Sequence, residues 1–105
     1  MFAYLQGVRF YLGACKDGHL AGPNAEELIS VLIAETNVKD PAIYRGVSPN
    51  GVDPDGRLDL ESLNTDLDFF KQLKLVPDSA TVAAALDTSF VEAALQKIGP
   101  YAAGR

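Results

Sequence analysis

The chain has 105 residues, with nine Lys and Arg against fourteen Asp and Glu, and a formal net charge of −5. Its length suits a single domain, and 48% hydrophobic against 22% charged residues excludes an intrinsically disordered protein. The scattered basic residues form no stripe for a phosphate backbone, so we expect no nucleic-acid partner. The single Cys15 excludes an internal disulfide and a cysteine-rich zinc site.

The first segment predicts a helix over residues 2–16, because apolar side chains such as Tyr4 and Val8 recur at helical spacing. Further apolar residues lie around most of its circumference, so we expect this helix to be packed against other elements on more than one side. Cys15 is expected to be a small buried side chain on the helix, and Gly18 the left-handed residue that ends it.

The same segment is a poor secretory signal, because it has no basic residues before the apolar run, and Gln6 and Arg9 interrupt that run. No apolar run approaches the roughly 18 residues that span a bilayer. A chain expressed as written is therefore expected to stay in the cytoplasm.

A second helix is predicted over residues 24–37. Asn24 has Glu27 three residues later, which is the spacing of a capping box. The apolar stripe that follows contains the predicted core residues Leu28 and Leu32.

Two helices are predicted in the middle of the chain, over residues 40–47 and 59–74. Asp40 and Pro41 read as an N-cap followed by proline at the first helical position, and Asp59 is the predicted N-cap of the longer helix. The core residues predicted on that longer helix are Leu63, Leu67 and Phe70.

A last helix is predicted over residues 88–98, with Ser89 as N-cap and Glu92 completing a capping box. Its predicted core residues are Val91, Leu95 and Ile98. Since no strong alternating strand pattern appears, the fold class is mainly α. About five helices with irregular connections form one helical domain or fragment, residues 1–105.

The stretch NGVDPDGRLDLESL, residues 50–63, resembles the middle of an EF-hand calcium loop. Aligned on its turn glycine, it has Asp53 and Asp55 at ligand positions, but Gly51 and Ser62 stand where the first and last oxygen ligands belong. The alternative is a Pro-Asp-Gly turn that leads into a capped helix. We favour the turn, and predict no metal and no cofactor.

No residue pattern predicts catalysis. His19 is the only histidine and is expected in a solvated loop, while Ser89 lacks the surroundings of a nucleophile elbow. Asp66 and Asp68 diverge from the buried stripe of their helix and are expected on a solvated face. We therefore predict that the protein is not an enzyme, with no catalytic residue and with its ligand-binding residues unknown.

Several phrases in this order resemble one protein family. They are AYLQGVRFY, KDG, LAGPNAEELISVL, VKDPAIYR, DPDGRLDLESLNTDLDFFKQLKLV and ALDTSFVEAALQKIGPY. Together they resemble the C-terminal third of the substrate-binding proteins of ABC importers, in the nitrate/sulfonate/taurine family that includes thiamine-precursor binders.

The resemblance implies a two-lobed α/β protein of the periplasm that closes on a small solute and delivers it to a membrane permease. It implies that this chain supplies the C-terminal helical part of such a fold. The sequence then corresponds to a truncated or partial solute-binding component, which is not expected to bind a sulfonate, nitrate or pyrimidine-like solute alone.

The alternative function is a free-standing helical module that binds another protein. In either case the apolar first helix needs a partner, and leaving such side chains in water forgoes about 1.5–3 kcal/mol each. The chain is therefore expected to form a homo-oligomer through an apolar helix face.

Overall fold

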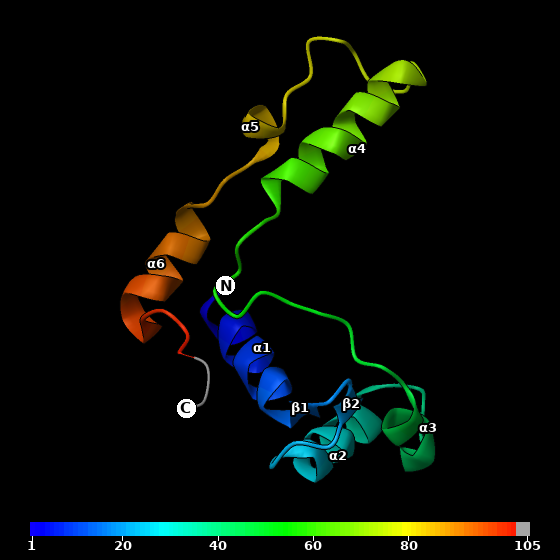
Figure 1. Cartoon of the computed structure of the whole chain (residues 1–105). Helices are drawn as coiled ribbons and strands as arrows, with labels where there is room; N and C mark the ends of the chain where they lie inside the picture. The colour runs from blue at the N-terminus through cyan, green and yellow to red at the C-terminus, as the bar shows by residue number, and fades with distance from the viewer. Residues whose placement is uncertain (103–105) are drawn as a thin grey trace.

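The computed structural model describes residues 1–102 and confirms a mainly helical fold (Figure 1). In this part of the chain there are six helices and one short β-hairpin. In chain order the elements are α1 (Phe2–Ala14), β1 (Cys15–Lys16), β2 (His19–Leu20), α2 (Ala25–Glu35), α3 (Pro41–Gly46), α4 (Leu60–Gln72), α5 (Val82–Ala85) and α6 (Ser89–Ile98). All except the hairpin and α5 lie within the ranges expected from sequence.

The hairpin corrects the expected end of the first helix. α1 stops at Ala14, and Cys15 pairs with Leu20 across an antiparallel ladder, so the half-buried Cys15 is a strand residue. Asp17 and Gly18 form the turn with φ of 52° and 77°. Positive φ at both central residues matches the right-handed twist of paired strands, which is why Asp-Gly is a strong hairpin signal.

A small core joins α1, the hairpin and α2. Its buried residues are Ala14, Leu20, Ala25, Leu28 and Ile29, with Ala14 0% exposed. Gly22 allows the close approach, because a Cβ there would lie 2.2 Å from the carbonyl oxygen of Gly13. α3 covers this core through the half-buried Tyr44.

A second buried cluster forms on the N-terminal half of α1. Leu5 is 0% exposed and Val8 is also buried. Leu5 lies beside Gly56 and Val91, since a Cβ placed on Gly56 would be 3.0 Å from Leu5 Cδ2 and 3.4 Å from Val91 Cγ2. α1 is thus covered on two sides, by α2 at one end and by the Gly56 loop and α6 at the other.

The predicted core was only partly right. Leu28 is buried, but Leu32, Leu63, Leu67, Val91, Leu95 and Ile98 are half-buried. Phe70 is 44% exposed, and its assignment to the core was wrong. The cause is that α4 packs mainly against α5, a helix of only four residues, which is too short to cover the apolar stripe of α4.

Of the four predicted caps, Asp40 and Asp59 are confirmed, whereas the side chains of Asn24 and Ser89 do not cap their helices. Asp40 accepts a hydrogen bond from the backbone N–H of Ala42 at 2.9 Å. Asp59 accepts a hydrogen bond from the backbone N–H of Ser62 at 3.1 Å. Asn24 occupies the N-cap position of α2 but makes no capping bond, because its Nδ2 donates to the carbonyl of Phe10 at 2.8 Å. Ser89 is the first residue of α6, and Thr88 stands at the N-cap position without a side-chain capping bond. The N–H of Ser89 donates to Asp87 at 3.0 Å.

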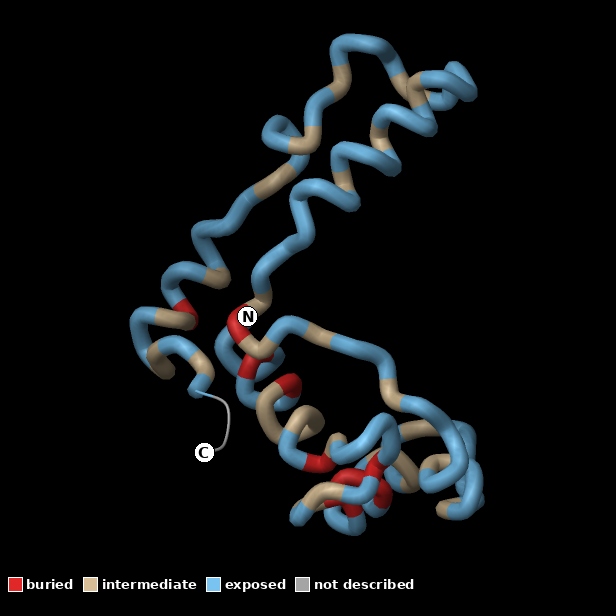
Figure 2. Tube along the Cα trace, viewed as in Figure 1, coloured by how far each residue is buried: buried red, intermediate tan, exposed pale blue. Residues whose placement is uncertain are grey.

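The molecule is open. α4 and α5 form an arm, residues 60–85, that projects away from α1, α2 and α3 and is exposed along most of its length (Figures 1 and 2). The Cα radius of gyration is 17.3 Å, against about 13 Å for a compact domain of this length. The accessible surface is 7587 Å², about 1900 Å² more than a compact protein of this mass exposes.

Among the described residues, no helix is both long and apolar enough to cross a membrane.

Candidate binding cleft

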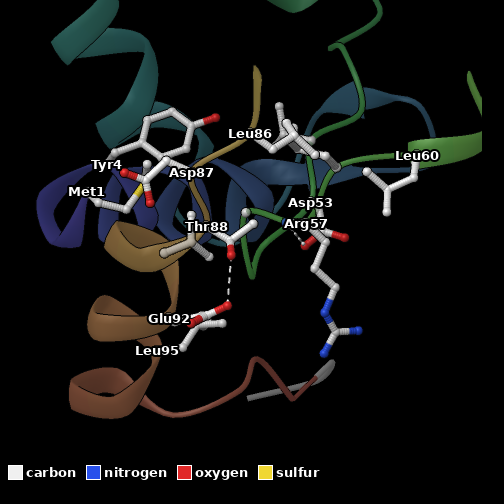
Figure 3. Close-up of a pocket in the computed structure, with 14 residues that line it drawn as sticks. Met1, Tyr4, Asp53, Arg57, Leu60, Leu86, Asp87, Thr88, Glu92 and Leu95 are labelled. Carbon is white, nitrogen blue, oxygen red and sulfur yellow. Dashed lines mark hydrogen bonds between the residues drawn. The ribbon is translucent and has the colours of Figure 1, made fainter. Parts of the chain in front are cut away.

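An open cleft of about 750 Å³ lies at the base of the arm (Figure 3). Four parts of the chain surround it: the start of α1, the loop before α4, the connection between α5 and α6, and one face of α6. Its lining residues are Met1, Tyr4, Val52, Asp53, Gly56, Arg57, Leu58, Leu60, Leu86, Asp87, Thr88, Val91, Glu92 and Leu95.

The walls of the cleft are mainly apolar. Tyr4, Leu58 and Leu60 are 57%, 54% and 51% exposed, so large hydrophobic side chains there are in contact with solvent. Soluble monomers rarely leave contiguous apolar patches uncovered, and such patches mark binding surfaces. This makes the cleft the strongest candidate site in the described part of the chain.

The rim of the cleft is acidic. Its charged lining residues are three acids, Asp53, Asp87 and Glu92, and a single base, Arg57. Asp87 accepts hydrogen bonds from the side chain and the backbone N–H of Ser89, and these bonds lower the pKa of Asp87 below its ordinary value. Its negative charge is therefore secure at neutral pH, and the rim favours a cationic partner.

A polar clasp fixes the loop that forms one wall. Arg9 donates from Nη2 to Asp55 Oδ1 at 2.8 Å and to the carbonyl of Gly99 at 2.7 Å, and from Nε to the carbonyl of Pro54 at 3.0 Å. Tyr101 also donates its backbone N–H to Asp55 Oδ1 at 2.8 Å. One arginine thus ties α1 to the loop before α4 and to the segment after α6.

The clasp explains why Asp55 is buried, with only 7% of its surface exposed. The N–H of Tyr101 lowers the pKa of Asp55, and the side chains of Arg9 and Arg57 lower it further. A buried carboxylate is tolerated when charged and hydrogen-bonding partners replace water. Arg57 lies 3.6 Å from Asp55 Oδ2, while its own side chain is 73% exposed.

The clasp is not evident from the sequence, although Arg9 interrupts the apolar run of the first helix. An arginine on such a helix must either reach water or meet a carboxylate. Asp55 stands 46 positions along the chain, and sequence spacing alone does not pair residues so far apart.

The calcium-like stretch forms a turn in this structure. Asp53 Oδ1 accepts from the N–H groups of Asp55 at 2.8 Å and Arg57 at 3.2 Å, and the N–H of Gly56 donates to the carbonyl of Asp53 at 3.1 Å. Gly56 has a φ of 68°, the left-handed conformation that glycine adopts without strain. Asp53 and Asp55 thus serve the turn and the clasp, and among the described residues no three His, Cys, Asp or Glu side chains gather as a metal site would require.

The other candidate side chains lie outside the cleft or serve structure. His19 is exposed, as expected, but it stands on strand β2 instead of in a loop. The Ser89 hydroxyl donates to Asp87 at 2.5 Å. Asp66 and Asp68 are exposed on α4.

A second apolar surface lies at the far end of α4. We call it the arm tip, and it comprises Phe69, Phe70, Leu73 and Leu75, which are 55%, 44%, 52% and 66% exposed. The two phenylalanine rings lie 6.1 Å apart between centroids. Lys71 and Lys74 are interspersed with these side chains, and Lys74 forms an exposed ion pair with Asp78 at 3.8 Å.

Comparison of the chain with protein-family models, curated proteins and solved structures finds no match. The cleft and the arm tip are therefore interpreted from their own geometry and chemistry.

Proposed function

We propose that this chain is the C-terminal helical part of the solute-binding component of an ABC importer, and that other protein covers its cleft and arm. The observation that carries the proposal is the excess accessible surface, about 1900 Å² beyond that of a compact protein of this mass. The ordered phrases that resemble the importer family support the same assignment.

Covering the arm tip has a large energetic effect for so small a protein. Fully burying one Leu or Phe side chain contributes about 1.5–3 kcal/mol. The free energy gained by covering the four half-exposed side chains of the arm tip is therefore a large fraction of the net stability of a whole domain, about 5–15 kcal/mol. A surface of this kind therefore favours binding to protein.

The cleft is a poor solute site for the anions of the family. Sulfonate and nitrate need positive charge and hydrogen-bond donors, whereas this cleft has apolar walls and three acids against one arginine on its rim. We therefore infer that the chain alone does not bind solute, and that the solute site and the contact with the permease form in the complete periplasmic component.

A free-standing helical module that binds another protein is the second candidate. The core between α1, the hairpin and α2 favours it, because Ala14 and Ile29 are 0% and 2% exposed without any second chain. An N-terminal half that packs by itself can present the arm to an unrelated partner.

Co-expression separates the two candidates. A tagged chain is produced together with the open reading frame immediately upstream of its gene, and the purified material is titrated with taurine, nitrate and a pyrimidine in a calorimeter. The importer proposal predicts a stoichiometric complex that binds one of these solutes, with permease and ATPase genes nearby. A chain that purifies without the upstream product, from a locus without such genes, contradicts it and leaves the interaction module.

A further inference from the structure

The arm tip and the cleft lie at opposite ends of the same helix. Leu60 lines the cleft at the start of α4, and Leu73 follows the last residue of that helix. A helix of 13 residues is about 20 Å long. Two arms laid antiparallel would therefore bring each tip to the cleft of the other molecule.

We propose that two copies of this chain pair in this way, with the arm tip of each copy in the cleft of the other. A two-fold axis near the middle of α4 relates the copies, so that the same two surfaces are used twice and the assembly closes as a dimer. The pairing does not depend on the proposed function, but it uses the same surfaces, so it describes the isolated chain in the absence of the covering protein.

Charge complementarity selects the antiparallel arrangement. The cleft rim carries Asp53, Asp87 and Glu92, whereas Lys71 and Lys74 lie among the arm-tip side chains, Lys74 in an exposed ion pair with Asp78. Antiparallel arms place these lysines beside the acids of the other copy. Parallel arms would place lysines beside lysines and acids beside acids, and like charges across an interface disfavour that alternative.

The available area suffices for a stable dimer. A standard specific interface removes about 800 Å² from each partner, and obligate homodimers remove more. Each copy exposes about 1900 Å² beyond the surface of a compact protein. Two arms and two clefts can therefore be covered while surface remains for solubility.

Cysteine cross-linking tests the geometry. In a Cys15→Ser background, Leu75→Cys labels the arm tip and Leu58→Cys labels the cleft, both at exposed positions. Mixing the two variants under mild oxidation should give a disulfide-linked dimer several-fold faster than either variant gives alone. Faster linkage of Leu75→Cys with itself would indicate parallel arms and overturn the proposal, as would the absence of linkage in the mixture.

The mass of the protein in solution tests whether the arm-tip residues hold the dimer together. Size-exclusion chromatography with light scattering should show a dimer for the wild type, and Phe70→Asp should raise the dimer dissociation constant at least tenfold. Val31→Asp is the matched control, since Val31 is 48% exposed on α2, outside both surfaces. Far-UV circular dichroism establishes that both variants remain helical. A monomeric wild type at about 100 μM, or equal weakening by Val31→Asp, would overturn the proposal.

The failure of one proposal is distinguishable from the failure of the other. Loss of the importer assignment, through absence of an upstream partner, leaves the cross-linking result unchanged. A wild-type chain that is monomeric alone but binds its upstream partner would refute only the pairing of two copies.

Discussion

Asn24 illustrates how one side chain departs from its expected role. It stands at the N-cap position of α2, yet its Nδ2 donates to the carbonyl of Phe10 and so joins α2 to α1. Its Oδ1 is buried and has no hydrogen-bond donor among the described residues. The amide group is therefore used for contact between helices, which the capping-box spacing did not reveal.

Replacing Asn24 by Asp distinguishes the two roles. Asp is as good an N-cap as Asn, so a capping role predicts little change. The observed contact predicts a loss of about 1–3 kcal/mol in the free energy of unfolding, because a buried carboxylate cannot donate to the Phe10 carbonyl. Urea denaturation at neutral pH measures the difference, and an unchanged midpoint would contradict the contact.

Asp55 makes stability depend on pH. Its pKa is lowered in the folded state, so its contribution is fully present above its unfolded pKa of about 3.9 and is lost as the pH falls through the lower folded value. We expect Asp55→Asn to be less stable than the wild type at neutral pH, and the difference to shrink as the solution is acidified.

Subtracting the variant from the wild type isolates Asp55, because Asp59 and Asp87 also have lowered pKa values and titrate in both proteins. Chemical denaturation at a series of pH values provides the data. A difference in unfolding free energy that stays constant down to about pH 3 would show that the charge of Asp55 does not stabilise the clasp.

At the scale of elements, the sequence predicted most helices and missed the contacts between them. Proline and acidic caps mark the starts of α3 and α4 locally, as Asp40 and Asp59 show. The Asp17-Gly18 dipeptide is typical of a hairpin turn, but the two-residue strands beside it are too short to show an alternating apolar pattern. The cleft could not be predicted, because residues 1, 52 to 60 and 86 to 95 meet only in the folded chain.

The junction between α1 and the hairpin core is a sensitive point of packing. A methyl group at Gly22 would overlap the carbonyl oxygen of Gly13 at 2.2 Å. Gly22→Ala should therefore destabilise the protein by about 1–3 kcal/mol, the usual effect of overpacking.

Gly7→Ala is the control, on the exposed part of α1, the helix that Gly22 approaches. Nothing lies within 4 Å of a Cβ added there, and alanine favours helix over glycine by about 0.8–1.0 kcal/mol. Thermal denaturation should lower the melting temperature of Gly22→Ala and raise that of Gly7→Ala. Equal effects of the two substitutions would show that the close approach at Gly22 is absent.

At the scale of the whole molecule, the openness of the chain links its sequence to its proposed roles. The first helix was expected to carry the uncovered apolar surface. Leu5 and Val8 on this helix are buried, whereas Phe2 and Tyr4 are 41% and 57% exposed. The exposed apolar surface lies mainly on the arm and around the cleft. An apolar stripe along a helix predicts that this face of the helix will be buried, but it does not identify the protein segment that buries it.

The shape of the single chain can be measured by small-angle X-ray scattering on the Phe70→Asp variant, which is expected to be monomeric. A projecting arm predicts a radius of gyration near the 17.3 Å of the structure. A value near about 13 Å, that of a compact domain of this length, would show that the arm folds back on the body and covers its own tip.

The central claim for the isolated chain is that a second copy covers its arm and cleft. Sedimentation equilibrium from about 1 to 100 μM tests it most directly. We predict a mass that rises from 11.2 kDa toward twice that value, and a Phe70→Asp variant that remains at the lower mass. A wild-type chain that stays at 11.2 kDa throughout and unfolds cooperatively would contradict it.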